Sequence, residues 1–454
     1  TAKVIPLHKK GATNLMSNYR PISLLSVFNK LLEKIVYKRV YNFLLKNKVI
    51  YKYQFGFRKN HSTSLALLEV MDYCYKAIDD GYKVLGVFFD LQKAFDTVNH
   101  SILLNKLYNY GVRGVMFKWF HSYLNNRTQF TFLNDVSSET GLVTCGVPQG
   151  SVLGPFLFLI YVNDISVVSQ DCNLKLFADD TNLFIIDLSY VGLETKANEC
   201  LNRMYNWFAA NKLSLNVEKT CYMLLSPHHT QNNIDLHLLI GNQRICKVSS
   251  CKYLGVIIDD ALTWKLHIDL IYSKLIKFTS IFYKVRDVIP LSCRLKLYNA
   301  FVSPHIIYGV EVYANTFKTY LKKLSTLNNK IIRILNNKSI FMPVAQLYKS
   351  VNVLPILELH DLKILTLIYK CVHHKNLLPE VFHNYVTRTS TVHVHNLRRH
   401  FDLFVPRSRS NFGQRSSLFK GCVLWNSIPF EIKSNSSLTM FKKSVFNMLF
   451  ESIS

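Results

Sequence analysis

Short apolar runs that end at acidic residues are the most informative pattern in this chain. Residues 84–89 form one such run, which stops at Asp90, and similar runs lie on either side of the adjacent pair Asp179 and Asp180. Uninterrupted apolar runs of this length predict strands that are buried on both faces. If these strands are neighbours in one sheet, the three carboxylates converge at its edge. Three carboxylates at one edge are what two-metal phosphoryl transfer requires.

The acidic positions also have ordinary interpretations. An Asp-Asp pair commonly caps a helix or occupies a turn, and many strands end in Asp. However, repulsion and desolvation make two adjacent carboxylates beside buried strands costly, and a divalent cation removes that cost. The interpretation as a metal site therefore depends on the rest of the chain.

Helical periodicity alternates with these strands. Residues 28–48 place apolar side chains three and four positions apart, with Lys30, Lys34 and Lys38 on the other side. This predicts an amphipathic helix whose basic face is either solvated or lines a phosphate channel. Further helices are predicted at 64–79, 100–109, 117–124, 156–161 and 194–211, and strand pairs at 128–132 with 141–144 and within 251–259. Beyond residue 262 the pattern is helical and basic, so we expect an α+β part followed by an all-helical part.

The charge balance indicates a polyanionic partner. The 454 residues include 55 Lys and Arg against 29 Asp and Glu, which gives a net charge of +26. A globular chain this basic is typical of proteins that bind nucleic acid. The scarcity of acids also argues against an accidental acidic cluster. The length predicts about two to four subdomains.

Membrane and disulfide-rich classes are disfavoured. The longest apolar run, residues 152–162, contains Gly154 and Pro155 and is too short to cross a bilayer. Ten cysteines without a Cys-x-x-Cys pair are typical of reduced thiols in an intracellular protein rather than of a disulfide frame or a zinc ribbon. The chain begins at Thr1, and we expect it to be a fragment of a longer open reading frame.

Seven short motifs follow one another along the chain. They occupy residues 18–25 (NYRPISLL), 54–63 (QFGFRKNHST), 89–96 (FDLQKAFD), 146–155 (GVPQGSVLGP), 177–180 (FADD), 211–220 (NKLSLNVEKT) and 253–256 (YLGV). Together they resemble the reverse transcriptases of non-LTR (LINE-type) retrotransposons, in particular those of jockey-like elements. Any one motif is weak evidence, whereas seven in register are specific.

The resemblance implies a right-hand polymerase, an RNA-directed DNA polymerase that extends the 3′-hydroxyl of a nicked target strand with dNTPs on an RNA template. Its expected parts are fingers at 1–85, a palm with an antiparallel sheet at 86–260 that contains an inserted fingers segment at about 101–145, a helical thumb at 261–342 and a mostly helical C-terminal region at 343–454. In related full-length elements an endonuclease precedes this part, and no ribonuclease H pattern follows the thumb here. Such proteins are expected in the nucleus and the cytoplasm.

The resemblance also implies roles for the acidic residues. Asp90 and Asp179 are expected to bridge two Mg²⁺ ions, for which Mn²⁺ can substitute, and Asp180 is expected to be an outer or conditional ligand. Lys219 matches a motif whose lysine protonates the departing pyrophosphate. An ordinary solvated loop lysine would give the same pattern.

Four residues are expected at the nucleotide. Phe95, five positions after Asp90, would exclude the ribose 2′-hydroxyl, or it is a core residue, or both. Gln149 would reach the sugar or base and Gly150 would let the backbone approach the nucleotide, unless the two merely form a turn and a helix cap. Arg58 would bind the triphosphate through its guanidinium, with a generic basic residue as the alternative.

A hairpin is expected to hold the primer. The resemblance assigns this primer grip to Tyr253, Leu254 and Gly255. Its function is positional, because in-line attack tolerates little displacement of the 3′-hydroxyl.

The C-terminal region contains two groups of polar residues. One has no standard zinc spacing, so no zinc is predicted; its members are Cys371, His373, His374, His393 and His395. The other would bind phosphates of RNA or target DNA, as a disordered basic tail also would; its members are Arg398, Arg399, Arg407, Arg409 and Arg415.

Two other functions fit parts of the pattern. A catalytically inactive retroelement-derived protein would bind nucleic acid only; the intact Asp90, Asp179 and Asp180 argue against it, whereas the truncated start argues for it. A group II intron maturase is the second alternative, and the FADD turn together with residues 424–429 (LWNSIP) disfavours it. Template-dependent dNTP incorporation separates a polymerase from the first alternative.

Overall fold

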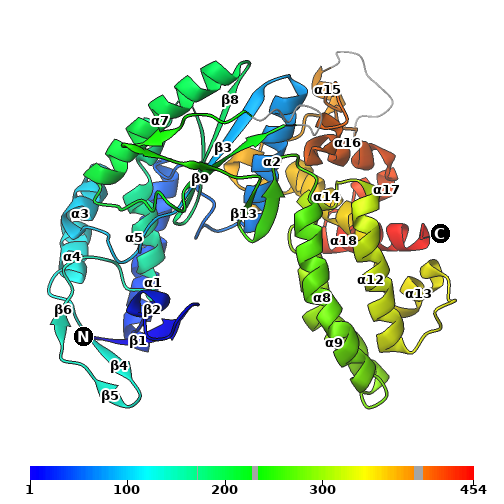
Figure 1. The fold of residues 1–454 in the computed structure, drawn as a ribbon, viewed down its shortest axis with the longest axis horizontal. Coiled ribbons are helices and arrows are strands. Elements are labelled where there is room, and N and C mark those ends of the chain that lie inside the picture. The colour runs from blue at the N-terminus through cyan, green and yellow to red at the C-terminus, as the bar shows by residue number, and fades with distance from the viewer. Residues whose placement is uncertain (171, 227–233, 393–401, 454) are drawn as a thin grey trace.

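A five-stranded sheet forms the centre of the first part of the chain (Figure 1). The computed structural model describes residues 1–170, 172–226, 234–392 and 402–453. The strands follow the spatial order β12-β9-β3-β8-β7. They are β3 (Lys83–Phe89), β7 (Asn173–Phe177), β8 (Asp180–Asp187), β9 (Cys221–Leu225) and β12 (Cys246–Lys247). β3 pairs antiparallel with both β8 and β9, and β7 forms a hairpin with β8.

β3 is apolar throughout because both of its faces are covered. Val84 and Phe88 belong to one core, and Leu85 and Val87 belong to another, as the two-residue period of a strand requires. The first core contains α2 (Thr63–Asp79), which packs on β3, and extends into the helices that follow residue 265. The second core is supplied by α1 (Val27–Lys46), α3 (His100–Asn109), α4 (Gly114–Leu124), α5 (Leu153–Val162), α6 (Ile165–Val168) and α7 (Tyr190–Ala210). A continuous apolar run is the expected sequence of a strand in this position.

A second sheet combines the N-terminal strands with a later segment. β1 (Ala2–His8) pairs antiparallel with β2 (Tyr19–Leu24) and parallel with β4 (Thr128–Leu133). β4 also pairs with β5 (Val136–Ser137) and β6 (Gly141–Leu142). The strand pair predicted in this segment is confirmed. β5 was not predicted, because both of its residues are exposed and give no apolar period.

The rest of the chain is mostly helical, and the α+β architecture is as predicted. Its helices are α8 (Lys265–Val285), α9 (Leu291–Phe301), α10 (Ser303–Ile307), α11 (Val310–Tyr313), α12 (Lys318–Asn336), α13 (Val344–Val351), α14 (Ile356–His373), α15 (Thr389–Val392), α16 (Ser417–Ser427), α17 (Phe430–Lys433) and α18 (Leu438–Glu451). Two short hairpins precede them, β10 (Leu239–Ile240) with β11 (Gln243–Arg244) and β13 (Ser250–Tyr253) with β14 (Val256–Asp259). Single 3-10 turns occupy Met16–Asn18, Lys375–Leu377, Glu380–Phe382 and Gly413–Arg415. α8 packs along α12, and the two run side by side in Figure 1.

Two general properties can be read from the described ranges. Their cysteines form no disulfide bond. None of their helices combines the length and the apolar character that a membrane-spanning segment needs.

The C-terminal part returns to the central sheet through α2. Asp72 Oδ1 accepts a hydrogen bond from the backbone N–H of Ser417 at 2.6 Å, and the Tyr385 hydroxyl donates to Asp72 Oδ2. About two turns further along the helix, Asp79 Oδ1 accepts a hydrogen bond from the Ser410 hydroxyl at 2.6 Å. Residues seven positions apart share one helix face, so Asp72 and Asp79 form one polar face of α2 that binds the C-terminal part.

Asp72 gives this contact a pH dependence. Burial raises the pKa of its carboxyl to about 7, although hydrogen bonds from Tyr385 and Ser417 oppose the shift. An unfolded Asp titrates near ~3.9. The folded state therefore holds the proton more tightly, and the free energy of unfolding contributed by this group falls as pH rises from ~4 to about 7. Asp72→Asn cannot ionise, so we expect it to flatten this part of the profile and to be more stable than the unmodified chain above about pH 7.

Denaturant unfolding on both sides of this pH range measures the effect. Asp80→Asn is the matched control, because Asp80 is exposed at the end of the same helix and its substitution should leave the profile unchanged. If Asp72→Asn loses stability with rising pH as steeply as the unmodified chain, Asp72 is not the titrating group.

Candidate active site

The three acidic residues lie at one edge of the central sheet. Phe89, at the end of β3, is paired with Thr181 of β8. Asp90 therefore leaves β3 at the edge where the β7–β8 turn carries Asp179 and Asp180. The prediction that these strands are neighbours is confirmed by this register.

Burial and repulsion raise the pKa of both carboxyls in the turn. The pKa of Asp180 rises to about 6, first because of burial and then because of the charges of Asp179 and Asp90. The pKa of Asp179 is raised chiefly by burial, while the positive charges of Arg20 and Lys9 oppose the rise and Asp90 adds to it. A cation placed among these groups would remove the repulsion.

The loop before β9 holds Asp90 in place. The backbone N–H of Asn216 donates to the Asp90 carbonyl at 2.8 Å, and the Asp90 N–H donates to the Thr220 hydroxyl at 3.3 Å. The same loop brings Lys219 Nζ to 3.8 Å from Asp90 Oδ2. The two side chains are 71% and 47% exposed, so this pair adds little to stability and the ammonium is accessible to a substrate.

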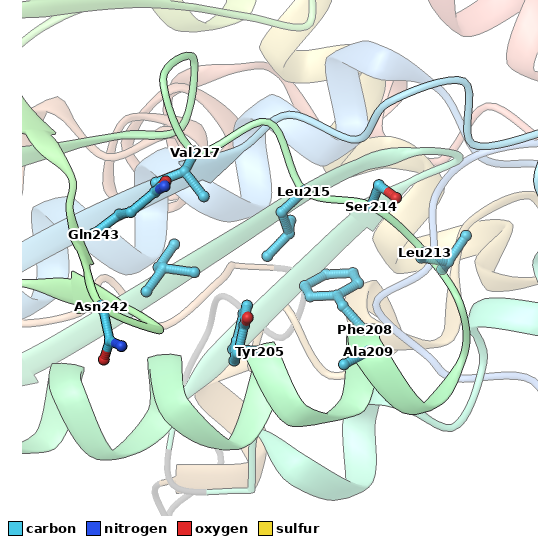
Figure 2. Close-up of a pocket in the computed structure, with 10 residues that line it drawn as sticks. Tyr205, Phe208, Ala209, Leu213, Ser214, Leu215, Val217, Asn242 and Gln243 are labelled. Carbon is cyan, nitrogen blue, oxygen red and sulfur yellow. The ribbon is translucent and has the colours of Figure 1, made fainter.

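A cavity of about 490 Å³ lies between this loop and α7. Figure 2 shows Tyr205 and Phe208 rising from α7 toward Leu215 of the loop, with Asn242 and Gln243 of the β10–β11 hairpin at the other end. Hydrogen bonds therefore join one side of the loop that carries Lys219 to Asp90. The side of the loop that faces α7 borders the cavity.

Phe95 is partly buried and lies five positions after Asp90 in the chain. Its ring stacks on the buried ring of Phe158 with centroids 4.5 Å apart. Its other neighbour is Phe57, which meets it edge-on at 6.1 Å and is 48% exposed. Phe95 is thus a packing residue that also reaches the surface, and the aromatic neighbour Phe57 was not predicted from the sequence.

Gln149 and Gly150 are engaged within the protein. Gln149 Nε2 donates to Asp96 Oδ1 at 2.9 Å, and the Gln149 carbonyl accepts from the Ser23 N–H at 2.6 Å. Gly150 has a φ of +109°, and a Cβ there would lie 2.7 Å from the Ser23 carbonyl oxygen. The close approach to β2 is therefore sufficient to require glycine here. Gln149 also lines a cavity of about 350 Å³ together with Asp96 and Lys93.

Arg58 is used inside the fold. Its Nη1 donates to the backbone carbonyls of Tyr51 and Gln54 at 3.0 and 3.1 Å. The guanidinium therefore holds the loop before α2 in place. Among the described residues, it has no hydrogen bond to Asp90, Asp179 or Asp180. Its expected contact with a triphosphate gains no support from this geometry.

Two cations at the acidic edge were missed from the sequence. The positive charges that act on Asp179 come from Arg20 and Lys9, at and beside the β1–β2 hairpin. Arg20 lies inside the first of the seven motifs, which was a usable signal. Lys9 had none, because it is one of many lysines in a basic chain.

The predicted primer grip is the β13–β14 hairpin. Tyr253 is 3% exposed and packs against Phe88 of the central sheet. The turn consists of Leu254 and Gly255, both with positive φ, and the Tyr308 hydroxyl donates to the Leu254 carbonyl at 2.5 Å. Tyr253 and Leu254 are both buried and anchor the hairpin in the core, and Gly255 is the exposed residue of the three.

The polar C-terminal residues are mostly used for packing. His373 Nε2 is hydrogen-bonded to a backbone carbonyl at 3.0 Å, and the Arg415 guanidinium lies over the ring of Phe317 at 4.0 Å. Arg407 and Arg409 are exposed on the segment that Asp79 anchors. Outside the described residues lie His393, His395, Arg398 and Arg399.

The acidic edge suits a cation that binds together with a substrate. Within the described ranges no three His, Cys, Asp or Glu side chains are grouped closely enough to hold a metal by themselves. Mg²⁺ keeps several waters and usually binds through one or two carboxylates plus substrate phosphates. Asp179 and Asp180 carry raised pKa values, first because of burial, and their oxygens suit Mg²⁺ or Mn²⁺ better than zinc. Asp90, Asp179 and Asp180 therefore fit such an ion.

A sheet edge with three carboxylates, close to the positive charges of Arg20 and Lys9, suits an enzyme that transfers phosphoryl or nucleotidyl groups. The family described as reverse transcriptase (RNA-dependent DNA polymerase) matches residues 7–258. The chain belongs to this family, and the match includes the whole acidic edge.

Curated relatives show which group of reverse transcriptases the chain resembles. The RNA-directed DNA polymerase from mobile element jockey of Drosophila melanogaster is 28% identical over 364 residues, which cover 78% of this chain and 39% of that protein. The probable RNA-directed DNA polymerase from transposon BS of the same species is 27% identical over 369 residues, covering 77% and 40%. The predicted resemblance to non-LTR retrotransposon reverse transcriptases is confirmed. The chain spans about two fifths of the length of these relatives.

Solved structures are more distant. Apo telomerase from Candida tropicalis covers 83% of this chain and 68% of its own, with 12% identity and a TM-score of 0.41. A similarity of this size adds nothing to the assignment, which depends on the family match.

Proposed function

We propose that this chain is the polymerase part of a non-LTR retrotransposon protein and that it extends the 3′-hydroxyl of a DNA primer with dNTPs on an RNA template. The observation that carries this proposal is the placement of Asp90, Asp179 and Asp180 at one edge of the sheet that the family match spans. Relatives named RNA-directed DNA polymerases and a net charge of +26 support it.

The acidic edge is the proposed site of chemistry. Asp90 and Asp179 would hold two Mg²⁺ or Mn²⁺ ions, with Asp180 as an outer ligand, and the metals when bound would acidify the primer hydroxyl and neutralise the triphosphate. The primer 3′-hydroxyl would lose its proton to solvent water, its oxygen would bond to the α-phosphorus of the dNTP, and the bond from that phosphorus to the bridging oxygen would break, which releases pyrophosphate. Lys219, 3.8 Å from Asp90, donates a proton to that leaving group.

The surrounding residues orient the substrates. Arg20 and Lys9, whose charges already act on Asp179, neutralise the incoming triphosphate. Phe95 limits the space beside the sugar. Gln149, which lines the cavity of about 350 Å³, contacts the nucleotide. The β13–β14 turn supports the primer end.

The division into polymerase parts follows from this function. We assign the fingers to 1–85 with an inserted segment at about 101–145, the palm to the rest of 86–260, the thumb to 261–342 and a family-specific region to 343–454. The pairing of β1 with β4, which joins the first and the inserted segments, supports the fingers assignment. An endonuclease upstream in the full-length element would supply the nicked primer, and the protein would act on nuclear target DNA after synthesis in the cytoplasm.

Binding to a primer–template should depend steeply on salt. The charge of +26 implies several phosphate contacts, and each contributes a log–log slope of about −0.7 to −0.9. Fluorescence anisotropy across a salt series measures the slope. Charge reversals at the exposed Arg407 and Arg409 should reduce it if these residues touch phosphates. An affinity that stays flat between low and moderate salt would contradict an electrostatic binding channel.

Primer extension by the purified chain tests the function directly. RNA template, DNA primer, dNTPs and Mg²⁺ should give template-dependent products that disappear when EDTA removes the metal. Nucleic-acid binding without any incorporation, in Mg²⁺ or in Mn²⁺, would favour the inactive nucleic-acid-binding alternative.

A further inference from the structure

The turn that carries the paired carboxylates has an unusual backbone. Ala178 has a φ of +59° and is 5% exposed. The left-handed region is unfavourable for residues other than glycine, so the surrounding structure must hold this conformation. The directions of Asp179 and Asp180 depend on it, because they follow immediately along the chain.

The second fingers motif lies against this turn. The N–H of Phe55 donates to the Leu176 carbonyl at 2.8 Å, and the Leu176 N–H donates to the Tyr53 carbonyl at 3.1 Å. The segment therefore runs beside β7 in a parallel bridge between Gln54 and Leu176. It reaches the end of β7 just where the turn begins.

Gln54 bonds directly to the turn. Its side chain is buried at 2% exposure, and its Oε1 accepts from the N–H of Gly56 at 2.8 Å and from the N–H of Ala178 at 3.1 Å. Its Nε2 is buried without a hydrogen-bond partner among the described residues. An unpaired buried donor costs free energy, so this residue is placed for its acceptor oxygen and not for stability alone.

The neighbouring residues keep this contact in place. A Cβ on Gly56 would lie 2.3 Å from the backbone nitrogen of Ala178, so only glycine permits the approach. Arg58 bonds the carbonyl of Gln54 itself. Arg58 of the same motif therefore helps to hold Gln54 against the turn.

We propose that Gln54 is a positioning residue that fixes the Ala178 amide and thereby aims Asp179 and Asp180 at the metal ions. A neutral amide serves here because an ionised acceptor would add a third negative charge beside the pair. The proposal rests on the proposed function. Displacements of about 1 Å at such a site can cost ~100-fold in rate.

Gln54→Met is the principal variant, because it keeps the length of the side chain and removes the acceptor. The matched control is Asn163→Leu. Asn163 is also buried, and it bonds the backbone of Val49 and Tyr51 at the start of the same segment without touching the turn. Both variants should lower the melting temperature. Only Gln54→Met should lower kcat, by ~100-fold, with KM for dNTP changed little.

Mn²⁺ binding without substrates provides a readout that needs no catalysis. Electron paramagnetic resonance should show Mn²⁺ bound at least ~10-fold more weakly to Gln54→Met than to Asn163→Leu or the unmodified chain. If Gln54→Met does not melt cooperatively, Gln54→Asn, which withdraws the same acceptor by one methylene, takes its place with the same expected losses.

The outcomes separate this proposal from the proposed function. An unmodified chain that fails to extend primers overturns the polymerase assignment, and the Mn²⁺ comparison still tests Gln54. Equal Mn²⁺ affinity in Gln54→Met and the control overturns the positioning role, as does a loss of kcat that follows melting temperature equally in both variants.

Discussion

Asp179→Asn is expected to reduce primer extension by at least about a thousandfold, or about 4 kcal/mol of transition-state stabilisation. The substitution preserves shape and removes one negative oxygen from the edge where Asp90 and Asp180 remain. Because the repulsion among these carboxyls falls, affinity for the primer–template should be unchanged or higher. Steady-state extension rates and a binding titration on the same preparation measure the two effects.

The matched control is Asp187→Asn. Asp187 ends the strand that Asp180 begins, and it pairs with Lys196 at 2.6 Å, far from the edge. It should retain most of its activity. Near-normal activity in Asp179→Asn, or an equal loss in Asp187→Asn, would remove the acidic edge from the mechanism.

Phe95→Ala is expected to admit ribonucleotides. The ring is only partly buried, and under the proposed function its removal opens room for a ribose 2′-hydroxyl. A steric clash in a tight site is worth roughly 2–4 kcal/mol, so the ratio of kcat/KM for rNTP over dNTP should rise by ~30–1000-fold. Use of dNTPs should fall modestly, because the stacking on Phe158 is also lost.

Phe158→Leu controls for that packing loss. Phe158 is fully buried beneath Phe95, so its substitution loosens the same contact without opening the site. It should lower the melting temperature and leave the rNTP/dNTP ratio unchanged. An unchanged ratio in a folded Phe95→Ala protein would leave Phe95 as a core residue with no part in sugar selection.

Local periodicity predicted the strands and helices well. The apolar run before Asp90 could be identified as a strand because both faces of β3 are buried, and the pairing with β8 brought the acids together as expected. β5 had no such signal, because its residues are exposed.

Residue roles were harder to predict, because a motif does not reveal which partner it serves. Gly150 approaches the backbone of Ser23 and Arg58 bonds two loop carbonyls, and the sequence indicated neither of these internal contacts. The same limit hid Gln54, whose partner Ala178 is 124 positions away. The Arg/Ser-rich segment likewise gave no sign that Ser410 would bond Asp79, 331 positions earlier.

The polar face of α2 formed by Asp72 and Asp79 also affects the order in which contacts form during synthesis. Its partners Tyr385 and Ser417 follow Asp72 by 313 and 345 residues. At the usual rates of translation, of ~5–20 residues per second, the ribosome needs roughly 15 to 70 seconds to make that stretch. During this interval α2 has been synthesised, but the partners of its polar face have not. A nascent chain therefore acquires its full set of α2 contacts only after Ser417 has been synthesised.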